Sequence, residues 1–231
     1  MGSNINPASL KEKEGTVKPR WQLAVYDFDG TLVDNILIAF ECMQAIFRTL
    51  VPHLTPPTLE EYRDSIGLDW AAFYHDRGIP KTARKEIIRI WAQHFDARKD
   101  EVYLHRGAQA LLKFCRRNDI PNAIVSASIS DIEPTLRRLR VLDFFKNIVI
   151  GTEDKSEALI QTLDFFGTKA EDAFYIDDSF DGITAAKKLG MGTIGFTEGH
   201  NSRKRILAAN PGAPVGSLYD VIEILQNGVN L

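Results

Sequence analysis

The sequence predicts an α/β protein in which a doubly wound, parallel, Rossmann-like sheet carries a small inserted domain made only of helices. From Arg106 onward, short apolar runs alternate with stretches of helical periodicity, which is the pattern of βαβ units. One further apolar run, 23–26, precedes this region, and no strand-like run lies between 36 and 104. We therefore expect 21–35 and 106–231 to form the sheet core and 36–105 to form a helical cap.

Length and composition are those of an ordinary globular protein. The chain has 231 residues, 44% hydrophobic and 26% charged, which is enough for one core plus an insert. Its net charge of −3 provides no basic field, so we expect neither a nucleic-acid nor a membrane partner. Residues 1–20 are rich in Lys, Glu, Asn and Pro and are expected to form a polar, partly disordered lead-in.

Two further features favour a cytoplasmic protein. No stretch is apolar and long enough to span a bilayer. The two cysteines, Cys42 and Cys115, stand in apolar helical surroundings without CxxC spacing, which favours reduced thiols in the core.

The first strand ends in an acidic turn. The run 23–26 is continuously apolar and so predicts a strand buried on both faces, with Asp27 at its carboxyl end. If the strand pleat continues, Asp27 and Asp29 point to the same side. Gly30 permits the bend that follows, Thr31 supplies a hydroxyl, and Asp34 or Asn35 can cap the next helix.

The cap is expected to consist of helices over 36–50, 59–66, 70–75 and 81–97. Its large aromatic residues are interpreted as cap core rather than as a substrate surface: Trp70, Phe73, Trp91 and Phe95. His75, His94 and His105 lack metal-ligand spacing and are interpreted as structural or exposed.

The second part of the chain alternates between the two element types. Helices are expected over 107–118, about 132–139, 155–166, 183–189 and 217–226, and strands over 123–125, 148–150, 174–176 and 193–196.

Polar residues of reactive type follow four of the strands. They are Asp27 and Asp29, Ser126, Lys155, and the cluster Asp177, Asp178 and Asp181. The carboxyl ends of parallel strands meet along one edge of a doubly wound sheet, so these side chains should converge there. Several carboxylates facing one lysine need a hard cation, and oxygen ligands suit Mg²⁺. Such a site could hold a phosphate dianion and transfer a phosphoryl group.

These motifs resemble the haloacid dehalogenase superfamily, specifically its phosphatases with a C1-type helical cap, the phosphoglycolate phosphatase and β-phosphoglucomutase group. Asp27-Phe-Asp-Gly-Thr-Leu-Val-Asp34 is similar to the first family motif, Ser126 to the second, Lys155 to the third and Asp177-Asp178-Ser-Phe-Asp181 to the fourth.

The resemblance implies a role for each matching residue. Asp27 would be the nucleophile that forms an aspartyl-phosphate. Asp29 would act as general acid and then as base, and would also give its backbone carbonyl to Mg²⁺. Ser126 would bind a phosphoryl oxygen and Lys155 would pair with Asp27. The residues Gly30, Thr31 and Ala127 would border the bound phosphate.

Two of these motifs depart from the family pattern, and the role of one cap residue stays open. Ser156 follows Lys155 where proline is usual, which leaves Lys146 and Lys169 as weaker alternatives. In the fourth motif we rank Asp178 above Asp177 as a metal ligand, and Asp181 is either a third ligand or a helix N-cap. Arg63 in the cap is either a ligand for a substrate carboxylate or an ordinary surface arginine.

The favoured function is therefore a Mg²⁺-dependent phosphatase that hydrolyses small phosphate monoesters, with phosphoglycolate-like metabolites as candidates. One alternative is a phosphomutase of the β-phosphoglucomutase type, because Ser126-Ala-Ser128 is similar to that branch, although Ile129-Ser130 then replaces the usual Lys-Asn. The other is a member that binds a phosphorylated ligand without turnover. The sequence does not indicate an oligomeric state.

Overall fold

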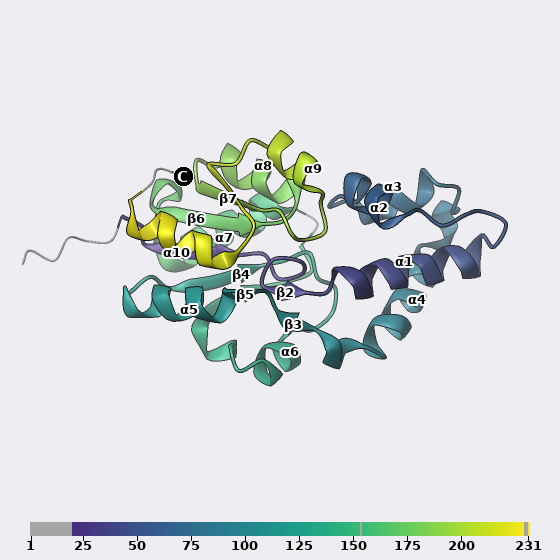
Figure 1. The fold of residues 1–231 in the computed structure, drawn as a ribbon, viewed down its shortest axis with the longest axis horizontal. Helices are drawn as coiled ribbons and strands as arrows, with labels where there is room; N and C mark the ends of the chain where they lie inside the picture. Colours follow the sequence, from purple (N-terminus) through teal and green to yellow (C-terminus); the bar gives the residue numbers. More distant parts are fainter. Residues whose placement is uncertain (1–19, 153, 229–230) are drawn as a thin grey trace, which may run out of the picture.

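The computed structural model describes residues 20–152, 154–228 and 231, so nearly all of the expected lead-in, 1–20, lies outside the described residues. Figure 1 shows a sheet core with a group of helices beyond one edge of it. The core strands are β1 (Leu23–Tyr26), β4 (Asn122–Val125), β5 (Phe145–Val149), β6 (Ala173–Asp177), β7 (Gly192–Phe196) and β8 (Ala213–Val215). The core helices are α5 (Ala108–Arg117), α6 (Glu133–Arg138), α7 (Lys155–Phe166), α8 (Phe180–Lys188), α9 (Arg203–Ala208) and α10 (Leu218–Gln226). Short 3₁₀ turns cover Lys81–Ala83, Lys99–Glu101, Leu142–Phe144 and Ala170–Asp172.

The six core strands form one parallel sheet in the order β5-β4-β1-β6-β7-β8. The predicted α/β class is thereby confirmed. Strand β1 lies in the middle, between β4 and β6, so its carboxyl end is flanked by the ends of strands from much later in the chain.

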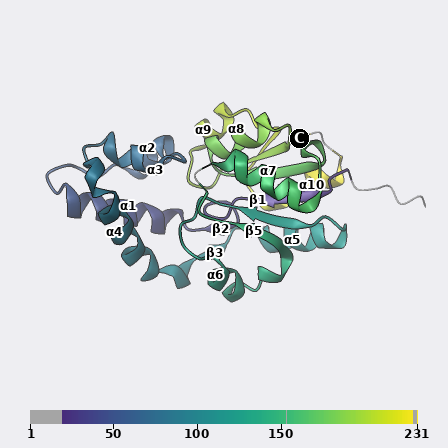
Figure 2. The same cartoon turned by 180° about the vertical axis from the view of Figure 1, so that it is seen from behind.

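Helices cover both faces of this sheet, and β1 contributes to both layers. Ala24 and Tyr26 pack in a cluster with residues of α5, α6 and α10, whereas Leu23 and Val25 pack against α7 and α8 on the opposite face. Figures 1 and 2 show the two layers from opposite sides. Because successive strand residues face opposite ways, a strand covered on both faces must be apolar throughout.

The inserted helices are α1 (Ile36–Leu50), α2 (Leu59–Ser65), α3 (Trp70–His75) and α4 (Arg84–Asp96). They have a hydrophobic cluster of their own, which includes Met43, Phe47, Tyr62 and Ile87. A capping box between Thr58 and Glu61 begins α2. This separate cluster supports the proposal that 36–105 is a cap.

Some elements differ from the sequence-based expectations. A two-residue strand, β2 (Val33–Asp34), pairs antiparallel with β3 (Tyr103–Leu104), where no strand was expected. Strand β8 and helix α9 were also not predicted. The expected cap function of Asn35 is wrong for its side chain, which makes no capping hydrogen bond to α1.

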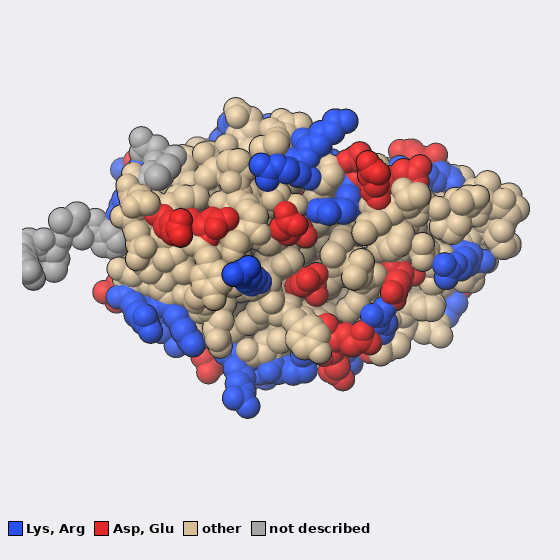
Figure 3. Space-filling view, in the orientation of Figure 1, with Lys and Arg blue, Asp and Glu red and all other residues tan. Residues whose placement is uncertain are grey.

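Charge is mixed on the face seen in Figure 3, where Lys and Arg alternate with Asp and Glu. Within the described residues, no helix combines the length and apolarity needed to cross a membrane. Cys42 and Cys115 are both buried and free, as expected.

Candidate active site

Three buried carboxylates meet where β1 and β6 end. Tyr26 pairs with Ile176 across these neighbouring strands, so the next residues, Asp27 and Asp177, come side by side. With Asp178 they offer oxygen atoms that all lie within 4.8 Å of one another. Segments about 150 residues apart thus form one acidic centre.

Lys155 is buried against this centre. It is the first residue of α7, whose N-cap Asp154 accepts hydrogen bonds from the backbone N–H groups of the first turn. Its ammonium nitrogen lies 2.7 Å from Oδ1 of Asp27 and 3.2 Å from Oδ2 of Asp177. It also donates to the Tyr175 hydroxyl at 2.7 Å. Burial alone would lower the pKa of Lys155, but the attraction of Asp177 and Asp27 outweighs it and raises that pKa.

The carboxylates carry more negative charge than one ammonium group can offset. Burial raises the pKa of Asp27 to about 7, with Lys155 opposing the rise and Asp177 adding to it. The pKa of Asp178 rises well above its usual range, first through burial and then through the charges of Asp177 and Asp27. Because the described donors are oxygens of three buried carboxylates, they fit a hard divalent cation.

Asp178 is held by the first turn of the chain and by the loop after β7. The Thr31 hydroxyl donates to its Oδ1 at 2.6 Å, and the His200 backbone N–H donates to its Oδ2 at 2.5 Å. A Cβ on Gly30, which has φ of +75°, would lie 2.4 Å from the Asp178 carboxylate, and a Cβ on Gly199 would lie 2.2 Å from it. Gly30 and Thr31 therefore support Asp178, and neither lines the cavity described below.

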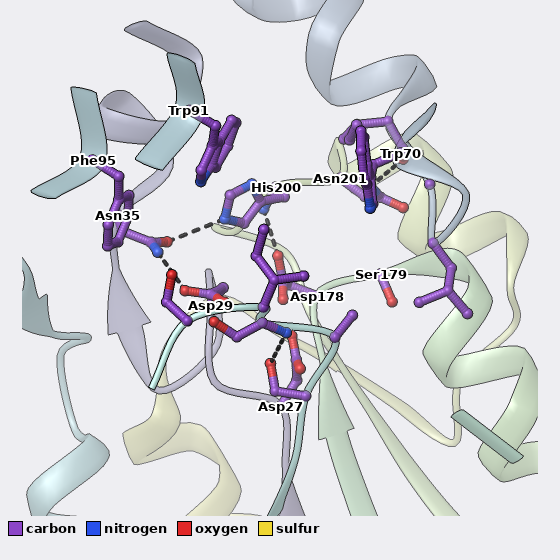
Figure 4. Close-up of a pocket in the computed structure, with 18 of the residues that line it drawn as sticks. Asp27, Asp29, Asn35, Trp70, Trp91, Phe95, Asp178, Ser179, His200 and Asn201 are labelled. Carbon is purple, nitrogen blue, oxygen red and sulfur yellow. Dashed lines mark hydrogen bonds between the residues drawn. The ribbon is translucent and has the colours of Figure 1, made fainter. Parts of the chain in front are cut away.

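Asp29 has its own support. The Asn35 amide donates to Oδ1 of Asp29 at 2.6 Å, while Oδ1 of Asn35 accepts from Gly30 N–H at 3.1 Å and lies 3.1 Å from Nε2 of His200. Figure 4 shows this chain of contacts beside Asp27. Burial raises the pKa of Asp29, and the hydrogen bonds from Asn35 and Ser128 oppose that rise. The environment therefore favours a carboxyl group that can hold a proton.

A cavity of about 220 Å³ opens above these residues, between core and cap. Its floor includes Asp27, Asp29, Ser126, Ala127, Lys155 and Asp178. Of the aromatic cap residues interpreted as cap core, Phe73 is buried in the cap cluster, and Trp70 and Trp91 pack against that cluster. Trp70, Trp91 and Phe95 also line the cavity and are partly buried, so these three border the site as well.

Two predicted site residues lie elsewhere, at the contact between cap and core. Arg63 donates to the carbonyl oxygens of Thr197 at 3.1 Å and Asn201 at 3.4 Å, and it does not line the cavity. Asp181 accepts a hydrogen bond of 2.8 Å from Leu68 N–H and lies outside the group of three carboxylates. The N-cap of α8 is Ser179, so the alternative that Asp181 is the cap is wrong.

Sequence reasoning missed His200 and Tyr175 and assigned Asn35 only a capping role. His200 follows β7 in the polar stretch Thr197-Glu-Gly-His-Asn201. The criterion of polar residues after a strand end, applied to this fifth strand, would have found it.

Known proteins with similar sequences belong to the family that the sequence motifs resemble. Residues 24–196 match the family model described as haloacid dehalogenase-like hydrolase. The chain is 24% identical to phosphoglycolate phosphatase 1 of Pseudomonas aeruginosa over 87% of this chain and 78% of that protein. It is 26% identical to the phosphoglycolate phosphatase of Synechococcus elongatus over 82% and 90% of the two chains.

Solved structures share the fold. A haloacid dehalogenase-like family hydrolase from Streptococcus pneumoniae has a TM-score of 0.75 at 19% identity, covering 90% of this chain and 99% of that one. A β-phosphoglucomutase from Clostridium difficile has a TM-score of 0.70 at 16% identity, covering 90% and 98%.

Proposed function

The chain belongs to the haloacid dehalogenase-like hydrolases, and we propose that it is a magnesium-dependent phosphatase that hydrolyses small phosphate monoesters through an aspartyl-phosphate. One observation carries the proposal. Asp27 lies at the floor of the cavity, paired with Lys155 at 2.7 Å, with Asp29 lining the same space. A nucleophile, a cation and a proton carrier are therefore in one place.

Asp27 and Asp178 are the side chains that we assign to Mg²⁺, with Asp177 as a further candidate. Bound there, the metal would offset the negative charge of the carboxylates and of a phosphate group. Asp178 lines the cavity and Asp177 does not, which supports ranking Asp177 below Asp178.

The reaction divides between the two carboxyl groups of the first turn. The Asp27 carboxylate attacks phosphorus, the bond from phosphorus to the alcohol oxygen breaks, and Asp29 gives its proton to that oxygen. Asp29 then takes a proton from water while the water oxygen attacks phosphorus. The bond from phosphorus to Asp27 breaks and inorganic phosphate leaves. Lys155 holds the Asp27 carboxylate in position, and the Ser126 hydroxyl would bind a phosphoryl oxygen.

The phosphoglycolate phosphatases among the relatives support hydrolysis of a small phosphorylated metabolite. Their identities of 24% and 26% support the reaction class more strongly than the choice of ester. A cytoplasmic location stays a prediction.

A phosphomutase is the second candidate, favoured by the similarity of Ser126-Ala-Ser128 and by the shared fold of β-phosphoglucomutase. A mutase would return the phosphoryl group to a sugar, whereas a phosphatase releases phosphate continuously. A protein that only binds the phosphorylated ligand would do neither.

The test is phosphate release from p-nitrophenyl phosphate and a panel of natural monoesters, with Mg²⁺ or with EDTA. We expect turnover that needs Mg²⁺ and is lost in Asp27→Asn. Asp143→Asn should keep it, because Asp143 is exposed in the turn before β5 and does not line the cavity. Isomerised sugar phosphate without net phosphate release would favour the mutase. Binding without either product would favour the non-catalytic alternative.

A further inference from the structure

The cap side of the cavity is apolar. Its lining residues from the inserted helices and their loops are Ile66, Gly67, Leu68, Trp70, Tyr74, Ile87, Ile88, Trp91 and Phe95. Apart from the hydroxyls of Tyr62 and Tyr74 and the indole N–H groups of Trp70 and Trp91, the polar lining groups come from the core side and from Asn35. A bound ester would therefore meet polar groups at its phosphate end and hydrocarbon or aromatic surface at its alcohol end.

The described lining residues offer no cation to a second anionic group. Lys155 is the only lysine or arginine among them, and it is engaged by Asp27 and Asp177. His200 contacts Asn35 through Nε2 and the Tyr62 hydroxyl through Nδ1 at 3.3 Å.

Three arginines of the cap contact other groups of the protein. Arg63 donates to backbone carbonyls of the core. Arg77 donates to the Phe73 carbonyl and lies over the Phe73 ring, and Arg84 lies over the ring of Trp70 at 4.8 Å. None of the three lines the cavity. A carboxylate on the part of the alcohol that contacts the cap wall would meet neither lysine nor arginine among the described lining residues, and burying a charge without a countercharge is costly.

Size and shape favour a ring. The cavity has a volume of about 220 Å³, and an apolar cavity of about 150 Å³ holds one benzene molecule. Trp91 and Phe95 are stacked with an interplanar angle of 10°, and Trp70 lies on the other side of the cavity in Figure 4. Aromatic side chains on two sides of the cavity give a bound ring apolar surface against which it can pack.

We propose that the substrate is a phosphate monoester of an uncharged, apolar alcohol that carries a single ring, and that Trp70, Trp91 and Phe95 select it. This inference rests on the proposed phosphatase activity and adds the class of the alcohol.

The test compares benzyl phosphate with 2-phosphoglycolate, both esters of primary alcohols, in the Mg²⁺-loaded wild-type protein. We expect kcat/KM for benzyl phosphate to be higher by about tenfold or more, which corresponds to about 1.4 kcal/mol. Equal values, or a preference for 2-phosphoglycolate, would overturn the inference and leave the phosphatase proposal standing. Absence of turnover with every ester would instead overturn the phosphatase proposal.

Variants of the cap wall test which residues select the alcohol. Trp91→Ala should lower kcat/KM for benzyl phosphate about tenfold, mainly through KM, with a much smaller change for 2-phosphoglycolate. Ile88→Arg places a cation on the same wall and should move the ratio toward 2-phosphoglycolate. Phe165→Ala is the matched control, because Phe165 is 61% exposed and lies outside the cavity. The aromatic wall does not select the alcohol if Trp91→Ala lowers kcat/KM equally for both esters and Ile88→Arg leaves the ratio of the two kcat/KM values unchanged.

Discussion

The side-chain amide of Asn35 donates a hydrogen bond of 2.6 Å to Oδ1 of Asp29, the carboxyl group to which we assign proton transfer. The oxygen of the same side-chain amide accepts a hydrogen bond from Gly30 N–H. Asn35 therefore links the Asp29 side chain to the turn on which Asp29 lies. Asn35 is thus a positioning residue for the proposed acid and base.

We expect Asn35→Ala to lower kcat by about 10- to 100-fold, the equivalent of losing one hydrogen bond to a charged group, about 1.5–3 kcal/mol. Asp29→Asn should lower kcat by about 10²- to 10⁴-fold, since it removes the proton carrier itself. Steady-state kinetics measure both. Asn118→Ala, on an exposed helix end, is the control and should leave kcat unchanged. An Asn35→Ala protein with wild-type kcat would exclude the positioning role.

Lys155 should also support the folded state. Lys155→Met leaves the neighbouring carboxylates without their cation, so we expect the free energy of unfolding to fall by about 3–5 kcal/mol in metal-free buffer. Urea denaturation measures it. Lys169→Met is the control, because the Lys169–Glu171 pair is 78% and 74% exposed and such a pair contributes about 0–1 kcal/mol. Similar losses in both variants would contradict a special role for Lys155.

Magnesium should stabilise the protein through the three-carboxylate centre. At a concentration about 100 times its dissociation constant, a ligand that binds only the folded state adds about 2.7 kcal/mol to the free energy of unfolding. We therefore expect Mg²⁺ to raise Tm in the wild type, and this shift to vanish in Asp178→Asn. Asp181→Asn should keep it, because Asp181 contacts Leu68 N–H outside that centre. A shift that depends on Asp181 and not on Asp178 would reverse the assignment.

Arg63 should act on cap closure rather than on a substrate carboxylate. Because its guanidinium donates to the carbonyls of Thr197 and Asn201, we expect Arg63→Ala to raise KM for benzyl phosphate and for 2-phosphoglycolate by the same factor, about tenfold. Arg89→Ala, exposed on α4 and paired with Glu86, should change neither. A loss confined to 2-phosphoglycolate would favour the carboxylate-binding hypothesis instead.

The cysteines predict an alkaline limit to stability. Burial raises the pKa of Cys42 to about 12 and that of Cys115 to about 11, against an ordinary value of 9.0. Above pH 9 the unfolded chain loses thiol protons that the folded chain keeps, so the free energy of unfolding should fall as pH rises toward those folded values. Urea melts at pH 8 and pH 10 measure the fall, which should shrink in Cys42→Ala relative to wild type. Native protein at pH 8 should resist iodoacetamide at both thiols, and rapid labelling would contradict their burial.

Much of the core could be predicted because its strands have a recognisable sequence pattern. The continuous apolar run before Asp27 and the polar residues after it indicate a central parallel strand that ends at a site. The same logic placed Lys155 and Asp178 near Asp27, where the structure has them.

The rest depends on contacts that no local pattern encodes. Strands β2 and β3 have two residues each, too few for any periodicity. The contact of Asn35 with Asp29 replaces a capping bond that its position favoured. The amphipathic stripe of its helix predicts the contact of Trp91 with the cap core. It does not predict that Trp91 also lines the cavity, because that depends on how the cap packs on the core.

The short pairing of β2 with β3 has one more consequence. Val33 is paired with Leu104, so the chain leaves the core and returns to it at a single point. We expect that a helical insert attached in this way can be exchanged for another without disturbing the core. Replacing the segment between Asn35 and Tyr103 with an insert of different length would alter which alcohol is accepted, while Asn35 stays beside Asp29 and the sheet that carries Asp27 keeps its register.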